Sequence, residues 1–299
     1  MSTTTTTQTL PPHALRKYAD LIFTGSRLQW SFFDPRTEVA CGDYGLLSEE
    51  TGLFAREGNI YDEGFARQYG IKQPEEVDGD EEARECWTIS KNARALTYGK
   101  EAKVPDADIQ KCDVKGHITF SSDRGAVLVT LDARTTSIPG KKSLKALISE
   151  PRLHGKHLVS EVVHCAKYAR YMSSPTGGDL TLGFDGKRWL AVGVTAEDTF
   201  QSGVSDTPAF FPLFRLQVMR DRGPILLLRD SPEPEDPAQL LAPLYPPWGA
   251  LDERGEKVLG GEWASSEEDF MREVEEEERH WAHAGVGKGS VPASPPASI

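Results

Sequence analysis

Four residues that could take part in catalysis or metal binding lie close together between positions 157 and 165. His157 and Glu161 are four positions apart, and His164 and Cys165 follow them. On a helix, His157 and Glu161 would share a face, where they could bind a metal ion or exchange protons. On a strand they would lie about 13 Å apart. The β-branched residues around them favour a strand, which predicts a surface pair, a packed histidine and a core cysteine.

The rest of the sequence lacks the short motifs of the common catalytic and cofactor sites. The patterns G-x-S-x-G, G-x-G-x-x-G, the phosphate-binding P-loop and H-E-x-x-H are all absent. Residues 78–82 place acids as a calcium loop does, but Ala83 and Ile89 stand where that loop needs glycine and glutamate. We therefore expect no enzyme, no cofactor and no metal site.

Composition narrows the class of protein further. The chain has 299 residues, with 34 Lys+Arg against 46 Asp+Glu and a net charge of −12, which excludes a wholly basic nucleic-acid binder. Its four cysteines form no C-x-x-C pair, and no apolar run approaches the roughly 18 residues of a membrane-spanning helix. The Thr-rich start resembles no signal peptide. These features predict a reduced, cytoplasmic protein with no nucleic-acid partner.

The acidic residues are concentrated near the C-terminus. Residues 231–299 carry fifteen acids against five bases, so most of the charge of −12 lies there. The rest contains a basic centre over 141–172. A basic body with an acidic appendage suggests a masked surface that binds anions, and the alternative is charge that only maintains solubility. The candidate anion-binding residues are Arg16, Lys17, Lys141, Lys142, Lys145, Arg152 and Lys156.

Aromatic and basic residues alternate over 167–171. This pattern could stack on bases or lie at a lipid headgroup layer. It could equally be an ordinary strand with side chains alternating between two faces.

The texture of the chain predicts an α+β fold, with a mainly antiparallel twisted sheet, hairpins and a few short helices. The expected organisation is a disordered tract over 1–12, the α+β domain over 13–230, a Pro-rich, protease-accessible linker over 231–250, an acidic tail with an amphipathic helix over 251–284, and a disordered tail over 285–299.

Periodicity and turn residues predict several elements inside the domain. A helix over 13–24, opened by Pro12, would place Arg16 and Lys17 opposite or flanking its apolar face. A second short helix is expected over 141–147. Hairpins are expected over 114–131 and 180–194, with turns at 121–125 and 185–187. Residues 155–171 favour one long strand.

The acidic tail contains a stripe of apolar residues at helical spacing. Acids crowd this helix, and an isolated helix of its length is marginal in water. The stripe therefore needs a surface to pack on, and the basic body is the expected one. The candidate docking residues are Trp263, Phe270, Val274 and Trp281.

The order of these elements resembles the pore-forming N-terminal domain of gasdermins, including the gasdermin-like proteins of fungi. The similar patches are Gly42-Asp43, residues 54–61, residues 155–163 and residues 213–219 followed by 225–228. The resemblance as a whole covers residues 13–230. The sequence is also similar to uncharacterised proteins of mushroom-forming fungi. Two departures are the short C-terminal region, which is nearer the short tails of fungal members, and the acidic loop 74–85, which has no counterpart.

The resemblance implies a function that the composition does not show. It implies a latent pore-forming protein of programmed cell death, activated when a protease removes the acidic tail. Anionic phospholipids, the activating protease and further copies of the chain would be its partners, and it would move from the cytoplasm to the membrane. The alternative is a non-enzymatic cytosolic module that binds another protein through its tail and linker.

Overall fold

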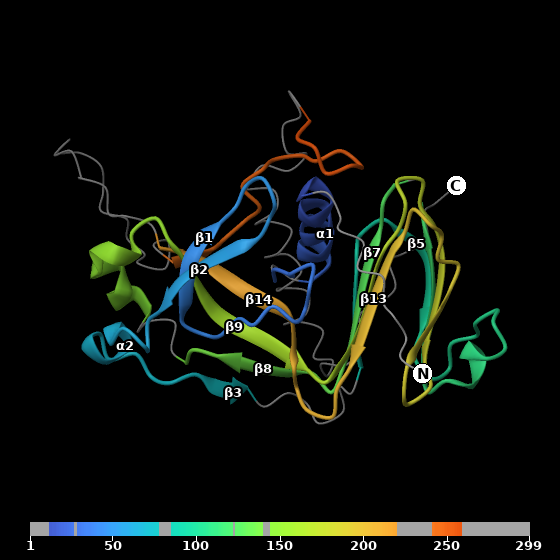
Figure 1. The fold of residues 1–299 in the computed structure, drawn as a ribbon, viewed down its shortest axis with the longest axis horizontal. Helices are drawn as coiled ribbons and strands as arrows, with labels where there is room; N and C mark the ends of the chain where they lie inside the picture. The colour runs from blue at the N-terminus through green and yellow to red at the C-terminus, as the bar shows by residue number, and fades with distance from the viewer. Residues whose placement is uncertain are drawn as a thin grey trace, which may run out of the picture.

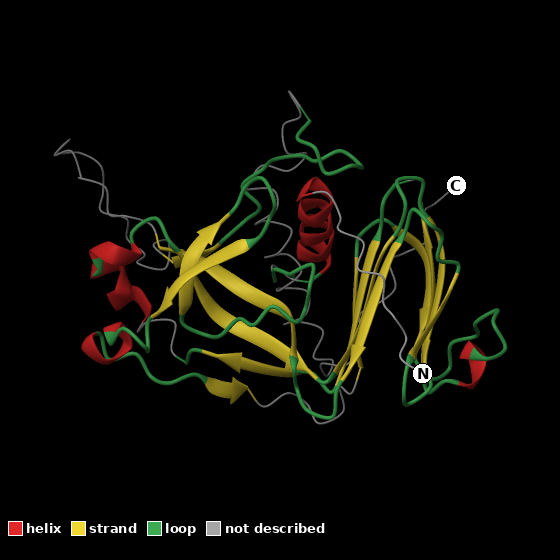
Figure 2. Cartoon of the chain, in the orientation of Figure 1, coloured by secondary structure: helices red, strands yellow, loops and turns green. Residues whose placement is uncertain are grey.

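The computed structural model describes residues 12–26, 29–77, 85–121, 123–139, 144–219 and 241–258. Within these ranges the chain forms three antiparallel sheets and a few short helices, which confirms the predicted α+β class. Figures 1 and 2 show one sheet on one side of α1 (Pro12–Gly25) and two facing sheets on its other side. The predicted tail helix and its docking residues Trp263, Phe270, Val274 and Trp281 lie outside the described residues, as do the tracts 1–11 and 285–299.

The larger sheet, called sheet A, is built around one long central strand. Strand β9 (His157–Cys165) pairs with β14 on one edge, and with β1 and β8 on the other. The remaining strands extend the sheet outward from these neighbours. The neighbours of β9 are β1 (Asp43–Leu47), β8 (Arg134–Ser137) and β14 (Phe210–Met219), and the outer strands are β2 (Phe54–Asn59), β3 (Glu75–Val77) and β15 (Leu241–Pro243).

The other two sheets have four strands each and face one another, as β7 and β5 do in Figure 1. We call the pair the sandwich. Sheet B has, in order, β13 (Thr199–Val204), β10 (Lys167–Met172), β7 (Ala126–Leu131) and β4 (Glu85–Ile89). Sheet C has, in order, β12 (Trp189–Val192), β11 (Gly178–Phe184), β6 (Val114–Phe120) and β5 (Ala93–Tyr98).

Among the described residues, four short helical turns connect the strands. They are α2 (Phe65–Gln68), η1 (Ile109–Lys111), η2 (Lys145–Ser149) and η3 (Pro151–Leu153). Of the helix expected over 141–147, residues 141–143 lie outside the described part of the chain, Leu144 is helical, and residues 145–147 belong to the 3₁₀ turn η2.

The two sheets of the sandwich are connected as the two halves of a folded antiparallel sheet would be. Each strand of sheet B continues in the chain into the strand that occupies the same place in sheet C, in the pairs β4–β5, β6–β7, β10–β11 and β12–β13. Four bends make the crossings, at residues 90–92, 121–125, 173–177 and 193–198.

The two central strands of each sheet, β7 and β10 in sheet B and β6 and β11 in sheet C, keep one register through the bends that connect them. Phe120 pairs with Gly178 in sheet C, and Ala126 pairs with Met172 in sheet B. Five residues separate Phe120 from Ala126, and five separate Met172 from Gly178. The ladder of sheet B and the ladder of sheet C are therefore in register with one another on the two sides of these bends.

Apolar side chains from both halves fill the sandwich. The interior cluster comprises Ile118, Phe120, Val127, Val129, Leu131, Ala169, Tyr171, Leu180, Leu182, Phe184 and Trp189. Each large side chain hidden here contributes roughly 1.5–3 kcal/mol to folding, so opening the fold would be costly in water.

Helix α1 is covered on two sides because it lies between sheet A and the sandwich. Tyr18 and Ile22 pack with Leu128 and Met172 of sheet B, whereas Phe23 belongs to the core of sheet A beside Trp30. The helix over 13–24 is confirmed, and it begins at Pro12 as expected.

The two predicted hairpins have different outcomes. The second is confirmed, because β11 and β12 pair across the Asp185-Gly186 turn, with Phe184 opposite Trp189. The first is wrong, because β6 and β7 lie in opposite sheets and pair with other strands. Residues 121–125 make a bend from sheet to sheet instead of a hairpin turn.

The strand predicted over 155–171 is confirmed as extended chain but not as one strand. It divides near Ala166 into β9 of sheet A and β10 of sheet B. The alternation over 167–171 is thus that of an ordinary strand, with Ala169 and Tyr171 inside the sandwich.

The second half of the predicted linker belongs to the fold. Strand β15 pairs with β14, and Leu244 and Trp248 are buried in the core of sheet A. The prediction of an exposed, protease-accessible segment is therefore wrong for residues 241–250, because apolar side chains among the prolines anchor the chain. Residues 231–240 lie outside the described part of the chain.

Candidate functional site

A tight hairpin from the C-terminal part of the described chain lies against the start of α1. We call residues 250–258 the clasp. Val258 donates a backbone hydrogen bond to Ala250 O at 3.0 Å, and Asp252 donates one to Glu256 O at 2.9 Å. Gly255 closes the turn with a φ of +86°, a conformation that favours glycine.

The Asp252 carboxylate fixes the shape of the clasp. Its Oδ1 accepts bonds from the backbone N–H groups of Arg254 and Glu256, both at 2.8 Å. Burial alone would raise the pKa of Asp252, but these N–H groups bring it below the usual value. Asp252 is thus an anionic cap that holds the turn in one conformation.

The clasp covers the two basic residues of α1. Arg16 donates from Nε to Gly255 O at 3.0 Å and from Nη1 to Glu49 O at 2.9 Å. Lys17 Nζ lies 3.3 Å from Leu251 O and 3.5 Å from Glu253 Oε1. Each residue is only 6% exposed. Arg16 and Lys17 are therefore covered in this conformation, because clasp carbonyls and the β1–β2 turn occupy their donors. Their role in binding lipid stays a prediction.

The residues before the clasp anchor it to the core. The ring of Trp248 packs edge-on against Trp30, with centroids 5.6 Å apart. Its Nε1 donates to Asp20 Oδ1 at 3.3 Å, and burial raises the pKa of this carboxyl group. Helix α1 is thus held by both a tryptophan and the clasp.

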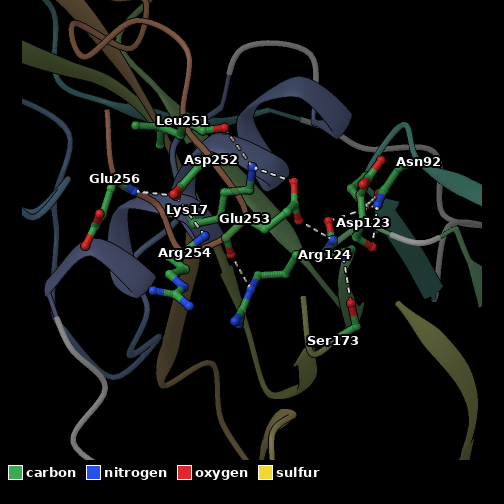
Figure 3. A network of polar contacts seen from close by, with 12 residues as sticks. Lys17, Asn92, Asp123, Arg124, Ser173, Leu251, Asp252, Glu253, Arg254 and Glu256 are labelled. Atoms are coloured by element: carbon green, nitrogen blue, oxygen red, sulfur yellow. Dashed lines mark hydrogen bonds and ion pairs between the residues drawn. The ribbon is translucent and has the colours of Figure 1, made fainter. Parts of the chain in front are cut away.

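The clasp also touches the sandwich, at the bend between β6 and β7 (Figure 3). The backbone N–H of Arg124 donates to Glu253 Oε2. The Arg124 side chain returns a bond from Nε to Glu253 O at 2.8 Å. Burial lowers the pKa of the Arg124 guanidinium, an effect that Glu253 opposes. One residue of the clasp therefore bonds to both α1 and the sandwich.

Two other candidate lipid-binding residues, Arg152 and Lys156, lie elsewhere and are paired. Arg152 contacts Glu150 at 3.1 Å and stacks over the Phe65 ring at 4.1 Å. Lys156 contacts Glu57 at 2.7 Å. Carboxylates therefore face the two described cations of the expected basic patch. Lys141 and Lys142, and the side chain of Lys145, lie outside what the structure describes.

The four potentially reactive residues of β9 form no common site. His157 Nδ1 accepts a bond from the backbone N–H of Leu47 at 3.1 Å, whereas Glu161 accepts one from the Gln29 side chain at 2.7 Å. Cys165 is fully buried. Burial lowers the pKa of His157 and of His164. The strand and the core cysteine are therefore confirmed, whereas His157 and Glu161 have separate partners and form no pair. The described residues contain no cluster that could hold a metal ion.

A buried cation under α1 had no sequence signal beyond the alternation of β10. Arg170 is 4% exposed, and its Nε donates to Gln201 Oε1 at 2.7 Å. Its guanidinium stacks on the Phe33 ring at 3.4 Å. Burial lowers the pKa of Arg170 to about 10. Its stacking partner comes from a distant loop, so local pattern could not reveal the pair.

A polar groove of about 500 Å³ lies beside η1 and the edge strand β12. Its charged side chains are paired locally, as in Lys111–Asp108 at 2.9 Å and Arg188–Asp185 at 3.4 Å. Nothing in the groove points to a reaction.

No helix among the described residues is long and apolar enough to cross a membrane. Comparison of the chain with protein-family models and with curated proteins gave no match.

Proposed function

We propose that this chain is a latent, non-enzymatic pore-forming protein of the gasdermin-like type, kept inactive by its C-terminal region. It would reside in the cytoplasm, bind anionic phospholipids when released by a protease, assemble with further copies and kill the cell. The observation that carries the proposal is the folded sheet of the sandwich, which conceals an apolar face.

Sheet C supports the proposal through its alternation. On β6 and β11, Ile118, Phe120, Leu180 and Leu182 point into the sandwich. The residues between them are polar and include His117, Thr119, Asp179 and Thr181. Strands with one apolar and one polar face are what a protein needs in order to span lipid with its backbone fully paired.

The bends could supply the residues by which β6 and β11 are too short to span a membrane. A membrane-spanning strand needs about 9–11 residues, and β6 and β11 are 7 residues long each. Straightening would lengthen each strand into its bend. The shared register of the two central strands lets both lengthen without slipping past one another. Polar bend residues such as Asp123 would then reach the headgroup layer.

Helix α1 and the clasp support the latency. The helix covers Leu128 and Met172 on the outer face of sheet B, and the clasp holds the helix in place. Release of the clasp would free Arg16 and Lys17, each of which adds about 1 kcal/mol of attraction to an anionic membrane. The acidic tail beyond it would oppose this attraction until it is removed.

The structure changes where cleavage would have to act. Because Leu244 and Trp248 are buried, a cut within 231–240 leaves β15 and the clasp attached by packing and hydrogen bonds. Removal of residues 231–299 would take both away, whereas removal of residues 259–299 would leave both in place.

Leakage of a dye from vesicles tests the proposal with matched truncations. The full chain, residues 1–258 and residues 1–230 are compared on phosphatidylcholine vesicles with and without phosphatidylserine. We expect only residues 1–230 to cause leakage, and only on the anionic vesicles. If residues 1–230 fold, as circular dichroism would show, and cause no leakage, the pore function is wrong and the interaction module replaces it.

A further inference from the structure

We propose that the clasp is a latch: besides covering the cations of α1, it holds the bends between sheets B and C in their folded conformation. We call the row of four bends the fold line. The inference rests on the proposed function, because it assigns a regulatory contact to the same sheet. It is argued from the hydrogen bonds of the bends and from the one residue that joins them to the clasp.

The four bends are bonded to one another in series. Ser90 Oγ accepts from Ala126 N at 2.9 Å, which joins the first bend to the second. Ser173 Oγ accepts from Gly125 N at 2.7 Å, which joins the second to the third. Asp198 Oδ1 accepts from Ser174 N at 2.6 Å, which joins the third to the fourth. A movement of one bend therefore disturbs its neighbours.

The clasp acts on the second bend through its backbone. The N–H of Arg124 donates to the Glu253 carboxylate, and the carbonyl of Arg124 accepts from Asn92 Nδ2 at 2.9 Å. Both backbone polar groups of Arg124, its N–H and its carbonyl, are thus bonded to side chains, and one of those side chains belongs to the clasp (Figure 3). The second bend cannot straighten into a strand while Glu253 holds it.

The same carboxylate joins the latch to the helix. Glu253 Oε1 lies 3.5 Å from Lys17 Nζ on α1. Departure of the clasp therefore frees the helix and the fold line together. This gives the order of events: the clasp leaves first, and the sheet opens afterwards.

Hydrogen exchange of the intact chain, without membranes, tests the latch. Glu253→Ala should speed exchange at the bonded amides of Gly125, Ala126, Ser173 and Ser174 by about ten- to a hundredfold, the range expected for losing a hydrogen bond to a charged group. Peptides from β9 and β14 should exchange as in the parent chain. Glu256→Ala is the matched control, since it removes a neighbouring exposed carboxylate of the clasp.

A second variant distinguishes a clasp that holds the second bend from a clasp that only covers α1. Lys17→Met removes the contact of Glu253 with α1 and leaves its bond to Arg124 in place, so we expect the bend amides to keep their protection. Equal acceleration by Lys17→Met and Glu253→Ala, or no acceleration by Glu253→Ala, would overturn the latch.

The outcome is independent of the pore experiment. Faster bend exchange in Glu253→Ala together with silent vesicles for residues 1–230 would leave the latch standing and remove the pore. Leakage by residues 1–230 with unchanged bend exchange in Glu253→Ala would do the reverse.

Discussion

The guanidinium carbon of Arg170 lies 3.4 Å from the centre of the Phe33 ring, and both lie beneath α1. This stack holds a cation on the outer face of sheet B without exposing it to water. The stack also fixes the position of α1, because the centre of the Tyr18 ring of α1 lies 5.6 Å from the same guanidinium carbon.

Replacing the planar guanidinium should therefore destabilise the chain. We expect Arg170→Lys to lower the free energy of unfolding by about 1–2 kcal/mol, since a lysine keeps the charge but loses the stack and the bond to Gln201. Urea unfolding followed by tryptophan fluorescence measures the change. Arg36→Lys, at an exposed arginine on the same loop as Phe33, is the control and should change little. Equal effects of the two substitutions would contradict a specific role for the stack.

Trp248 should prove essential to the fold even though it follows a proline-rich segment. Trp248→Ala removes a ring that is 3% exposed and packs on Trp30, which should cost about 3–5 kcal/mol. The same denaturation experiment measures it. Val258→Ala, at the exposed end of the clasp, should cost less than about 0.5 kcal/mol. A small effect of Trp248→Ala would mean that residues 241–258 are not anchored as described.

Gly255 should control access to the basic residues of α1. A Cβ at this position would lie 2.0 Å from His13 O, and its φ is +86°. We expect Gly255→Ala to displace the clasp, to speed tryptic cleavage after Arg16 and Lys17, and to increase binding to phosphatidylserine vesicles.

The control for this substitution isolates the steric effect. Gly70→Ala has a similar φ of +66° but open space around the new methyl group, so it pays the backbone strain alone. If both variants increased tryptic cleavage equally, general destabilisation would explain the result and the clasp would not.

Acidification should weaken the fold through His157. Burial lowers the pKa of His157 in the folded state, so between that pKa and the unfolded value near 6.5 the unfolded chain binds more protons. The free energy of unfolding should therefore fall as the pH drops below about 6.5. The structural reason is that Nδ1 accepts a bond from Leu47 N and cannot do so when protonated.

A substitution at His157 identifies this contribution. His157→Gln should flatten the dependence of stability on pH below about 6.5. His164, whose pKa burial also lowers, should account for the slope that remains. An unchanged slope in His157→Gln would show that its protonation is not coupled to folding.

The sequence could predict elements whose cause is local. Asp185-Gly186 marks a hairpin because those residues adopt the turn and the alternating strands beside it pair with each other. Residues 121–125 give a similar signal, yet β6 pairs with β5 and β11, and β7 with β4 and β10. A short polar turn reverses the chain in either case, and only long-range pairing decides between a hairpin and a crossing from sheet to sheet.

The candidate site was hidden from the sequence for a related reason. Helical periodicity located the face of α1 that bears Ile22, but it could not show that a second surface covers Arg16 and Lys17. Proline density suggested a linker over 231–250, although Leu244 and Trp248 were there as a sign of burial. Composition averages over such anchors, whereas packing depends on each one.

The equal lengths of the second and third bends have a consequence for how this chain can vary. Five residues lie in each bend, and the strands on both sides share one register. Deleting one residue from either bend would shift half of the ladder by one position and turn Val127 or Tyr171 out of the sandwich, onto the face of sheet B that packs against α1. Removing one residue from both bends together would restore the pairing between the central strands. Insertions and deletions at these two sites should therefore be tolerated only as compensating pairs.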